Sequence, residues 1–598
     1  MRKDYRINVT LTLVAPIITQ GLEGKLLGID TAALQVEKDG QPYPALPASL
    51  IRGNLRHAWK RLIELASGNF MSGSTITDWL GDESRENTFN MPVRAHLRSS
   101  DYWLANLAAT PDMRYRIAID PETGAVKRGA VQVIESPYPA GLRVDYSGWF
   151  EVSTDAAEAA EIRQKIMQGL QLVPALGAFK NVGFGRIESI VVSEPQACEP
   201  TKLTLPDSDS FGVVLQIDRP ICFAKIHAGD NRFEAENHIP GAALKGALLN
   251  RMTQLTEGEP RWQTLRKWID DVRFTHAFPA LPDAQQRGIP IPLSLYSDGV
   301  TIQDAALNPE QAISGDKAPI FQPDWKAEWG TVNPVFSGLP ADGEPQRELR
   351  VRTAIDIGSQ AAEDEKLFAL EVLSSSKHIW MSNVSLHQVD TTERSTVQKE
   401  LLDLLSYGLN GLGKTRAMTS GIEVQKTIPA IQESPTQTTL QAGQPLRLLL
   451  VTPARLLPDQ LNLPATNGGN QLHAYYAASW EALSEGSLKL LRFFAQQNLY
   501  GGDHYQQRFR LVEDDSVYNP LLLTSAGSLF VLTVVDADKA SECLQQWKQN
   551  GLPQLSGIAG GNHWKTNPLL AANGYGEILV DPSIPTIKLP TKEEKAHV

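Results

Sequence analysis

The sequence predicts an α+β protein made of tandem ferredoxin-like (RRM-like βαββαβ) domains with insertions. Three observations lead to this prediction. A glycine turn enters a strand three times along the chain, a proline-started basic helix precedes two of these turns, and an alternating strand precedes each helix. Repetition of this kind marks a repeated structural unit.

The chain has 598 residues, which is too long for one compact domain, and 42% of them are hydrophobic, which is enough for several cores. We predict domains at residues 1–200, 201–435 and 436–598, the last with a helical insertion. The formal net charge of −12 argues against a generic binder of nucleic acid. It leaves room for a local basic groove, because phosphate contacts need only a clustered subset of Lys and Arg.

Cysteine usage and hydropathy indicate the compartment. Cys198, Cys222 and Cys543 lie far apart and form no C-x-x-C pair. We therefore expect neither a disulfide framework nor a zinc ribbon, and the cysteine usage indicates a reducing cytoplasm. No apolar run is long enough for a signal peptide or a membrane span, so we expect a cytoplasmic protein with no membrane partner.

Each of the first two units opens with an alternating strand, at 5–16 and at 211–221. Residues two apart along a strand face the same side, so one face of the first strand is apolar. That face carries Ile7, Val9, Leu11 and Leu13.

A basic helix follows each opening strand, within 43–66 and within 237–255. In the first helix the basic residues recur every fourth position, beside an apolar stripe that faces a core. A solvated flank of an amphipathic helix is the alternative interpretation of this stripe. The basic positions are Arg52, Arg56 and Lys60 in the first helix and Lys245 in the second.

A duplicated pair of strands lies between each basic helix and the next glycine loop, at 114–144 and at 349–381. Each copy runs strand, Ile-Asp, turn, then a strand that ends near a glutamate, Glu135 or Glu371. The full order is strand, helix, strand, strand, helix, glycine loop and strand, which is the βαββαβ order.

The glycine loops carry most of the chemistry. The segment from Gly408 to Thr415 spells G-x-x-x-x-G-K-T, the P-loop pattern. A P-loop follows a strand and opens a helix, whereas here a helix precedes the glycines and a strand follows them. A nucleotide site is therefore disfavoured. A P-loop NTPase stays an alternative, in which Asp536, after the apolar segment 529–535, would serve as the Walker B aspartate.

Cations accompany the glycines in the first two loops, where they can attract phosphates without reading sequence. The third loop has Gly574 and Gly576 but Glu577 where the first loop has an arginine. We therefore predict RNA contacts in the first two loops only. These residues are Lys180, Gly183, Gly185 and Arg186 in the first loop and Gly411, Gly413, Lys414 and Arg416 in the second.

These motifs resemble the RAMP superfamily of CRISPR–Cas effector proteins. The resemblance rests on "IPGAALKGALLNR", on "RYRIAIDPETGAVKRGA", on the "GFGR" turn and on the segment 524–552. It implies a type III, III-D-like complex, in which a backbone-subunit domain is fused to a region that caps the 5′ handle of the crRNA. The implied partners are crRNA, target RNA and the other subunits of the complex.

The resemblance also implies a catalytic residue. Backbone subunits of type III complexes cut target RNA with an aspartate on the loop after the first strand, and Asp30 in Gly28-Ile29-Asp30 matches it. Its carboxylate could bind Mg²⁺ or another divalent cation, so metal-dependent endoribonuclease activity is expected. A non-catalytic crRNA-binding scaffold is the alternative. Asp230, in the shorter equivalent loop of the second unit, is expected to be structural.

Overall fold

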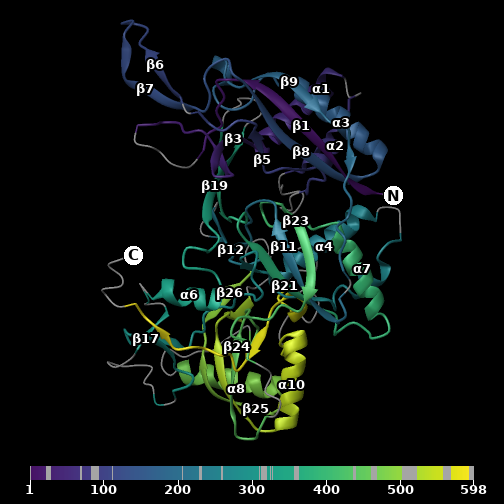
Figure 1. Cartoon of the computed structure of the whole chain (residues 1–598), viewed down its shortest axis with the longest axis vertical. Coiled ribbons are helices and arrows are strands. Elements are labelled where there is room, and N and C mark those ends of the chain that lie inside the picture. The colour runs from purple at the N-terminus through teal and green to yellow at the C-terminus, as the bar shows by residue number, and fades with distance from the viewer. Residues whose placement is uncertain are drawn as a thin grey trace. The chain divides into compact units, whose positions relative to one another are not determined.

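The computed structural model describes most of the chain (Figure 1). Helices and antiparallel sheets alternate along it, which confirms the α+β class. None of the helices in the described residues is both long and apolar enough to span a bilayer. The residues outside the described part are 1, 22–27, 67–69, 83–92, 111, 205, 228–231, 257–259, 309, 311–318, 323–324, 326–327, 356–361, 435–439, 459–467, 502–520, 556–567 and 591–598.

The chain divides into two compact units, each made of several segments. The predicted boundaries near residues 200 and 435 stay a prediction. Unit 1 comprises Met1–Glu199, Thr253–Glu259 and Leu349–Ala369, and unit 2 comprises Pro200–Met252, Pro260–Glu348 and Leu370–Val598.

An antiparallel sheet forms the body of unit 1. Its strands are β1 Lys3–Val14, β2 Gln35–Lys38, β3 Gln41–Pro47, β4 Arg98–Ser99, β5 Tyr102–Ala105, β8 Arg143–Thr154, β9 Arg186–Val192 and β10 Gln196–Ala197. The strand order is β9-β1-β8-β5-β3-β2, and β10 and β4 pair with β1 and β8. The apolar face predicted for the first strand is fully buried, because it packs against the helices described next.

Two helices, α1 (Ala48–Leu65) and α3 (Ala156–Gln171), cover that face of the sheet (Figure 1). They approach closely at Gly169, where a Cβ would lie 2.6 Å from Leu55 Cδ1. The Trp59 indole donates a hydrogen bond to the Lys165 carbonyl oxygen (2.8 Å), which fixes the contact between the helices. A shorter helix, α2 (Gly73–Leu80), packs against α1.

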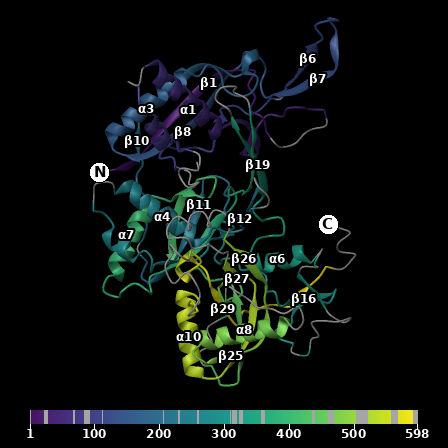
Figure 2. The same cartoon turned by 180° about the vertical axis from the view of Figure 1, so that it is seen from behind.

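A two-stranded hairpin, β6 (Asp112–Ile119) and β7 (Val126–Ser136), projects from unit 1 (Figure 2). The Asp120 carboxylate accepts the Glu122 and Thr123 N–H groups (2.9 and 3.1 Å), so the turn predicted at its tip forms. Exposed apolar side chains gather on the hairpin, which is unusual for a surface ribbon. They are Met113, Tyr115, Ile117, Ile119, Val126 and Val131.

Unit 2 contains two sheets of the same kind. The first has the order β22-β23-β11-β21-β14, with β15 also on β21 and with helices α4, α5 and α7. The bounds are β11 Ser210–Ile217, α4 Gly241–Leu255, α5 Gln263–Trp268, β14 Arg273–Phe274, β15 Phe278–Ala280, β21 Ile379–Ser385, α7 Arg394–Ser406, β22 Asn410–Leu412 and β23 Ala417–Lys426.

The second sheet of unit 2 has the order β25-β28-β24-β29. Its core is aromatic: the Trp480 ring lies 5.0 Å from Phe530 and 5.9 Å from Trp547, centre to centre. The elements are β24 Pro445–Leu450, α8 Gly468–Leu483, β25 Leu488–Phe494, β28 Leu529–Val534, α10 Ala537–Asn550 and β29 Ile578–Val580.

Smaller elements complete the described chain. They are β12 Ala224–His227, β13 Arg232–Ala235, β16 Leu295–Ser297, β17 Thr301–Asp304, β18 Ile320–Phe321, α6 Trp329–Ser337, β19 Arg347–Ile355, β20 Ala362–Leu373, β26 Gln497–Tyr500, β27 Leu521–Thr524 and β30 Ile587–Lys588.

The three main sheets share one strand order. Four strands of each sheet, numbered 1 to 4 along the chain, lie side by side in the order 4-1-3-2. These rows are β9-β1-β8-β5, β23-β11-β21-β14 and β29-β24-β28-β25. A helix follows the first strand and another follows the third in every case. This common order supports the internal repeat predicted from the glycine loops.

Candidate nucleic-acid interface

The first glycine loop is closed by its own backbone. The Gly185 N–H donates to the Pro16 carbonyl oxygen (2.8 Å), and the Leu176 N–H donates to the Gly185 carbonyl oxygen (2.9 Å). A Cβ on Gly185 would overlap the Leu176 carbonyl, so only glycine fits there. Gly183, also at positive φ (+92°), has no described atom within 4 Å of the place of a Cβ. Gly185 therefore closes the loop, and Gly183 leaves one side open.

The cations of this loop are exposed. Lys180 begins the 3₁₀ turn Lys180–Val182, and Arg186 begins β9. Two residues after Arg186, Glu188 Oε1 accepts a hydrogen bond from Nη2 of the exposed Arg143 (2.9 Å). The pKa of Glu188 is lowered, because Arg143 hydrogen-bonds to it and Arg186 adds positive charge. The two side chains predicted to contact phosphate at this loop are thus accessible to solvent.

The third glycine loop has the same hydrogen bonds as the first. The Gly576 N–H donates to the Pro453 carbonyl oxygen (2.9 Å), and the Leu552 N–H donates to the Gly576 carbonyl oxygen (2.8 Å). A 3₁₀ turn, Ala571–Asn573, again precedes a glycine at positive φ, Gly574 (+95°). The two loops are therefore one structural element in two copies.

The third loop is buried against the preceding sheet of unit 2, unlike the first. Glu577, where the first loop has an arginine, forms an ion pair with Arg287, and both side chains are less than one-tenth exposed. Burial alone would raise the pKa of Glu577, but Arg287 outweighs that effect and the pKa is lowered. A Cβ on Gly574 would lie 2.5 Å from His276 Nδ1. This loop serves packing, and the expectation that it does not bind RNA stays a prediction.

The second glycine loop follows helix α7 and leads into β22 and β23. A Cβ on Gly413 would lie 2.5 Å from the Cys222 carbonyl oxygen, and the Lys414 N–H donates to that same oxygen (2.8 Å). A P-loop needs the reverse order, strand then helix, with its amides turned to the ligand. Asp536, the aspartate of the NTPase alternative, is the N-cap of α10 and accepts the Lys539 N–H (3.2 Å). The geometry thus argues against a nucleotide site.

One cation of the second loop, Lys414, has a partner inside unit 2. Lys414 Nζ lies 3.7 Å from the centre of the Phe233 ring. Its pKa is lowered because the ammonium is partly withdrawn from water. Arg416 has a positive φ of 55°, which is uncommon for a residue with a Cβ, and Gly411 also has a positive φ.

Two of the three residues in the basic stripe of α1 form hydrogen bonds within unit 1. Arg52 Nη2 donates to the Leu80 carbonyl oxygen (2.7 Å), and Arg56 Nη2 donates to the carbonyl oxygens of Leu80 (3.1 Å) and Gly81 (2.6 Å). These carbonyls end helix α2, where positive charge is favourable. Lys60, the third member of the stripe, is exposed. Arg52 and Arg56 therefore have a structural role that the sequence did not predict.

Lys245, predicted from the second basic helix, is buried at 6% exposure. Its ammonium donates to the Asp270 carbonyl oxygen (3.4 Å). Burial lowers the pKa of Lys245 to about 8, although Asp270 and Asp271 oppose the shift. The prediction that Lys245 offers its charge to RNA is therefore not supported by its position.

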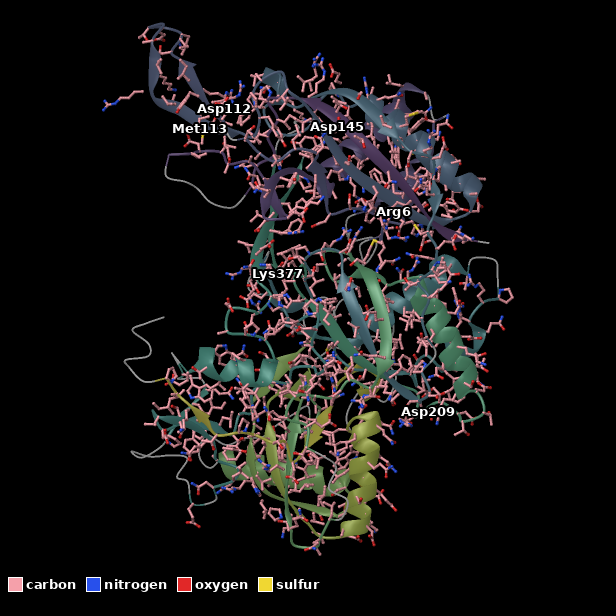
Figure 3. All side chains as sticks on the ribbon, in the orientation of Figure 1. Arg6, Asp112, Met113, Asp145, Asp209 and Lys377 are labelled. Carbon is pink, nitrogen blue, oxygen red and sulfur yellow. The ribbon has the colours of Figure 1, made fainter. Side chains whose placement is uncertain are left out.

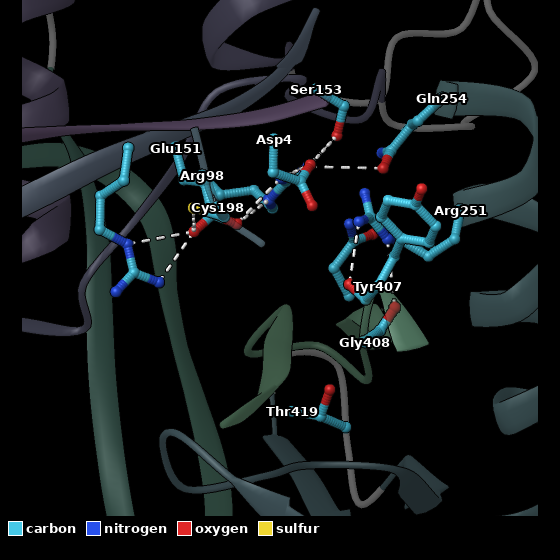
Figure 4. A network of polar contacts seen from close by, with 12 residues as sticks. Asp4, Arg98, Glu151, Ser153, Cys198, Arg251, Gln254, Tyr407, Gly408 and Thr419 are labelled. Atoms are coloured by element: carbon cyan, nitrogen blue, oxygen red, sulfur yellow. Dashed lines mark hydrogen bonds and ion pairs between the residues drawn. The ribbon is translucent and has the colours of Figure 1, made fainter. Parts of the chain in front are cut away.

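The sequence analysis missed Arg251, the last residue of the motif on α4. Its side chain is buried and donates to the Gly408 carbonyl oxygen from Nε (3.1 Å) and to the Tyr407 carbonyl oxygen from Nη2 (3.0 Å), as Figure 4 shows. Beside it, Asn250 Nδ2 donates to Asn410 Oδ1 (2.9 Å). These contacts hold the start of the second glycine loop. The signal in the sequence was that Arg251 is the last residue of the segment "IPGAALKGALLNR".

Figure 4 also shows a buried polar network in unit 1. Arg98 Nη2 lies 2.8 Å from Asp4 Oδ1 and 3.0 Å from Glu151 Oε1, and all three side chains are almost inaccessible. The Ser153 hydroxyl donates to Asp4 Oδ1 (2.6 Å). The arginine compensates two buried carboxylates, so the network is structural.

Asp30 is exposed beside the base of the hairpin. Its Oδ2 accepts the Val133 N–H (2.7 Å), and its own N–H donates to the Val133 carbonyl oxygen (2.9 Å). Among the described residues, Oδ1 has no protein partner. Within the part of the chain that the structure describes, one oxygen of Asp30 is therefore held by Val133 and the other is open.

A small apolar cluster brings the first loop and the Asp30 segment together. Ile134 of β7 and Phe184 of the glycine loop are buried in it, with Ala33, Ala178 and Phe179 packed around them. Near the base of the same hairpin, Arg116 stacks its guanidinium 4.7 Å from the centre of the Phe179 ring. The predicted catalytic segment, the hairpin and the first cation loop therefore share one part of unit 1.

A divalent cation could use the open oxygen of Asp30. Within the described residues there is no group of three or more His, Cys, Asp or Glu side chains arranged for a metal. A single carboxylate fits a hydrated Mg²⁺ ion, which keeps several waters and takes further oxygen ligands from a phosphate substrate. Asp230, the corresponding aspartate of the second unit, lies outside the described residues.

Comparison with known proteins supports the resemblance for unit 1. Residues 27–188 match the family model of the RAMP superfamily. A search of curated proteins found no match. The matched segment includes Asp30, helix α1, the hairpin and the first glycine loop. It supports a RAMP-type, CRISPR-associated subunit that binds crRNA together with other subunits.

Proposed function

We propose that the chain is a subunit of a type III CRISPR–Cas effector complex that binds crRNA and cuts the paired target RNA at one site. The observation that carries the proposal is the RAMP match over 27–188, since every predicted functional residue of unit 1 lies within it. The strand order common to all three sheets supports tandem ferredoxin-like domains. Unit 2 would then cap the 5′ handle of the crRNA, fused to a backbone-type unit.

The guide would be held through its phosphates. Lys60, Lys180 and Arg186 are exposed on unit 1, and the open side of Gly183 leaves space for a phosphate beside Lys180. Contacts of this kind fix a nucleic acid in register without reading its sequence. That suits a complex in which guide–target pairing supplies the specificity. Tyr115, 69% exposed on the hairpin, offers a ring on which a base can stack.

Cleavage would depend on Asp30. Val133 holds one oxygen of its carboxylate, and the other is open among the described residues of this exposed site, where a scissile phosphate can approach. Asp30 would hold Mg²⁺ or another divalent cation, which when bound offsets charge developing on the phosphate. The carboxylate would orient the target at this position, and the hairpin base beside it would limit which phosphate enters. One cutting position follows from the single Asp30.

A second candidate is the same subunit without cleavage. It is favoured by the isolation of Asp30, since within the described residues no cluster of metal-ligating side chains surrounds it. Asp30 would then serve only to anchor the loop to Val133. The two candidates make the same prediction for guide binding and opposite predictions for target cutting.

The test uses the full chain, reconstituted with its guide. Asp30→Asn should abolish cutting of a paired target at one position while guide binding stays unchanged. Asp112→Asn is the matched control, because Asp112 is an exposed carboxylate at the first residue of the same hairpin (Figure 3). Guide binding without any cutting by the unsubstituted protein would favour the scaffold. Failure to co-purify with a short RNA would refute both candidates.

A further inference from the structure

A glutamate at the same place in both duplicated strand pairs clamps the loop beside it. On β7, Glu135 Oε2 accepts the Ala33 N–H (2.9 Å), and Oε1 accepts the Gln35 side-chain amide (3.2 Å). On β20, Glu371 Oε1 accepts the Ala235 N–H (3.3 Å). Each carboxylate therefore binds the backbone of the segment that leads to a basic helix.

In unit 1 this clamp holds the segment that carries Asp30. Glu135 donates its own N–H to the Thr31 carbonyl oxygen (3.0 Å), and Thr31 and Ile134 form a parallel bridge. Directly before Thr31, Asp30 exchanges two hydrogen bonds with Val133. The segment is thus fastened to β7 at both ends, by Asp30 and by the Glu135 carboxylate.

The direction of the Asp30 carboxylate depends on this fastening. An exposed aspartate on a loop would normally sample several rotamers and loop positions. Here the loop lies along β7 because backbone bonds and the Glu135 carboxylate hold it, and Val133 then fixes one carboxylate oxygen. Hydrogen bonds to a charged acceptor are stronger than those between neutral groups. Loss of the Glu135 carboxylate would therefore free the segment next to Asp30.

We propose that Glu135 is a positioning residue for cleavage: it sets the place of Asp30 by clamping Ala33 and Gln35 to the hairpin base. This inference rests on the proposed cleavage at Asp30. Glu135 itself points to the protein backbone and touches no substrate in this role. Its counterpart Glu371 clamps a segment of unit 2 for which no cleavage is expected, and so provides an internal control.

The experiment compares Glu135→Ala, Glu135→Gln and Glu371→Ala in the full chain with bound guide. Hydrogen exchange at the Ala33 amide should accelerate about tenfold or more in Glu135→Ala, because a charge-assisted hydrogen bond is lost. Single-turnover cutting should slow about tenfold and need more Mg²⁺ for half its maximal rate, while the guide dissociation constant stays unchanged. Glu135→Gln keeps one acceptor oxygen and should give an intermediate rate. Glu371→Ala should leave rate and Mg²⁺ dependence unaltered.

The outcomes separate this inference from the proposed function. Faster exchange at Ala33 with unchanged cutting and Mg²⁺ dependence would show a merely structural clamp and overturn the inference. Equal slowing by Glu371→Ala would overturn it as well. If Asp30→Asn cuts as well as the unsubstituted protein, the proposed cleavage itself fails, and the positioning role fails with it.

Discussion

The repeated glycine loops allow one substitution to be compared in two environments. Gly183 and Gly574 occupy the same position of the loop, with φ of +92° and +95°. An alanine would pay the same backbone cost at both, about 1–2 kcal/mol. Among the described atoms, its Cβ would meet neighbours at Gly574 alone of the two, with His276 Nδ1 at 2.5 Å and the Phe274 carbonyl oxygen at 2.8 Å. Overpacking of this kind costs a further ~1–3 kcal/mol.

We therefore expect Gly183→Ala to lower the free energy of local opening by about 1–2 kcal/mol and Gly574→Ala by about 2–5 kcal/mol. Native-state hydrogen exchange on the full chain measures both, because each loop carries an equivalent reporter. The Gly185 N–H bonded to Pro16 reports on the first loop, and the Gly576 N–H bonded to Pro453 reports on the third. Equal losses, or a larger loss at Gly183, would refute the assignment of the third loop to packing.

Three further predictions concern charge. Arg98→Ala removes an ion pair from each of two buried carboxylates, Asp4 and Glu151, although Arg6 still contacts Glu151 (2.8 Å). We expect a loss of about 3–5 kcal/mol of unfolding free energy, and a thermal shift equivalent to under about 1 kcal/mol would contradict this. The pKa of His276 is lowered by burial and by the nearby His238, Arg273 and Arg287, so the unfolded chain takes up a proton at this residue first. The stability that His276 contributes should be complete above about pH 6.5 and fall by about 1.4 kcal/mol per pH unit below it. His238 stacks on His276 and its pKa is also lowered by burial, so it adds a dependence of the same sign. In denaturation series His276→Gln should reduce the slope, and an unchanged slope would contradict the prediction. The double variant Lys180→Ala with Arg186→Ala should reduce the slope of log guide affinity against log salt concentration by about 1.4. Lys489 is exposed on unit 2, and Lys489→Ala should leave the slope unchanged. An unaltered slope in the double variant would exclude both phosphate contacts.

Apolar residues that recur with a period of two or of about 3.6 predicted the core strands and helices well, because this local spacing decides which face of an element is buried. The strand expected at 5–16 is β1, with its four apolar positions buried, and the helix expected within 43–66 is α1. The turn at Asp120 also formed as its residues require. The projection of the hairpin could not be predicted. The apolar side chains of 113–131 suggest a buried ribbon, and only the fold shows that they stay exposed.

The site was harder to predict because the partner of a cation depends on tertiary structure. Arg52 and Arg56 show the spacing of an exposed stripe, yet their partners are the carbonyls that end α2, about 25 residues later. Lys245 lies in a family-like motif but faces the carbonyl of Asp270 inside unit 2. Sequence reveals that a residue is charged, whereas only the fold shows whether its charge reaches solvent.

The comparison of the first and third loops separates the roles of glycine and cation. Both loops keep the positive-φ glycines and the hydrogen bond from a glycine N–H to a proline carbonyl oxygen. The proline follows the first strand of its sheet, so these features join the glycine loop to the end of that strand. What differs is the next residue: Arg186 is exposed, whereas Glu577 is buried against Arg287. A glycine turn alone therefore does not indicate a phosphate site in this fold. The charge and exposure of the residue that follows it decide whether the turn offers a cation to solvent or packs against a neighbouring sheet.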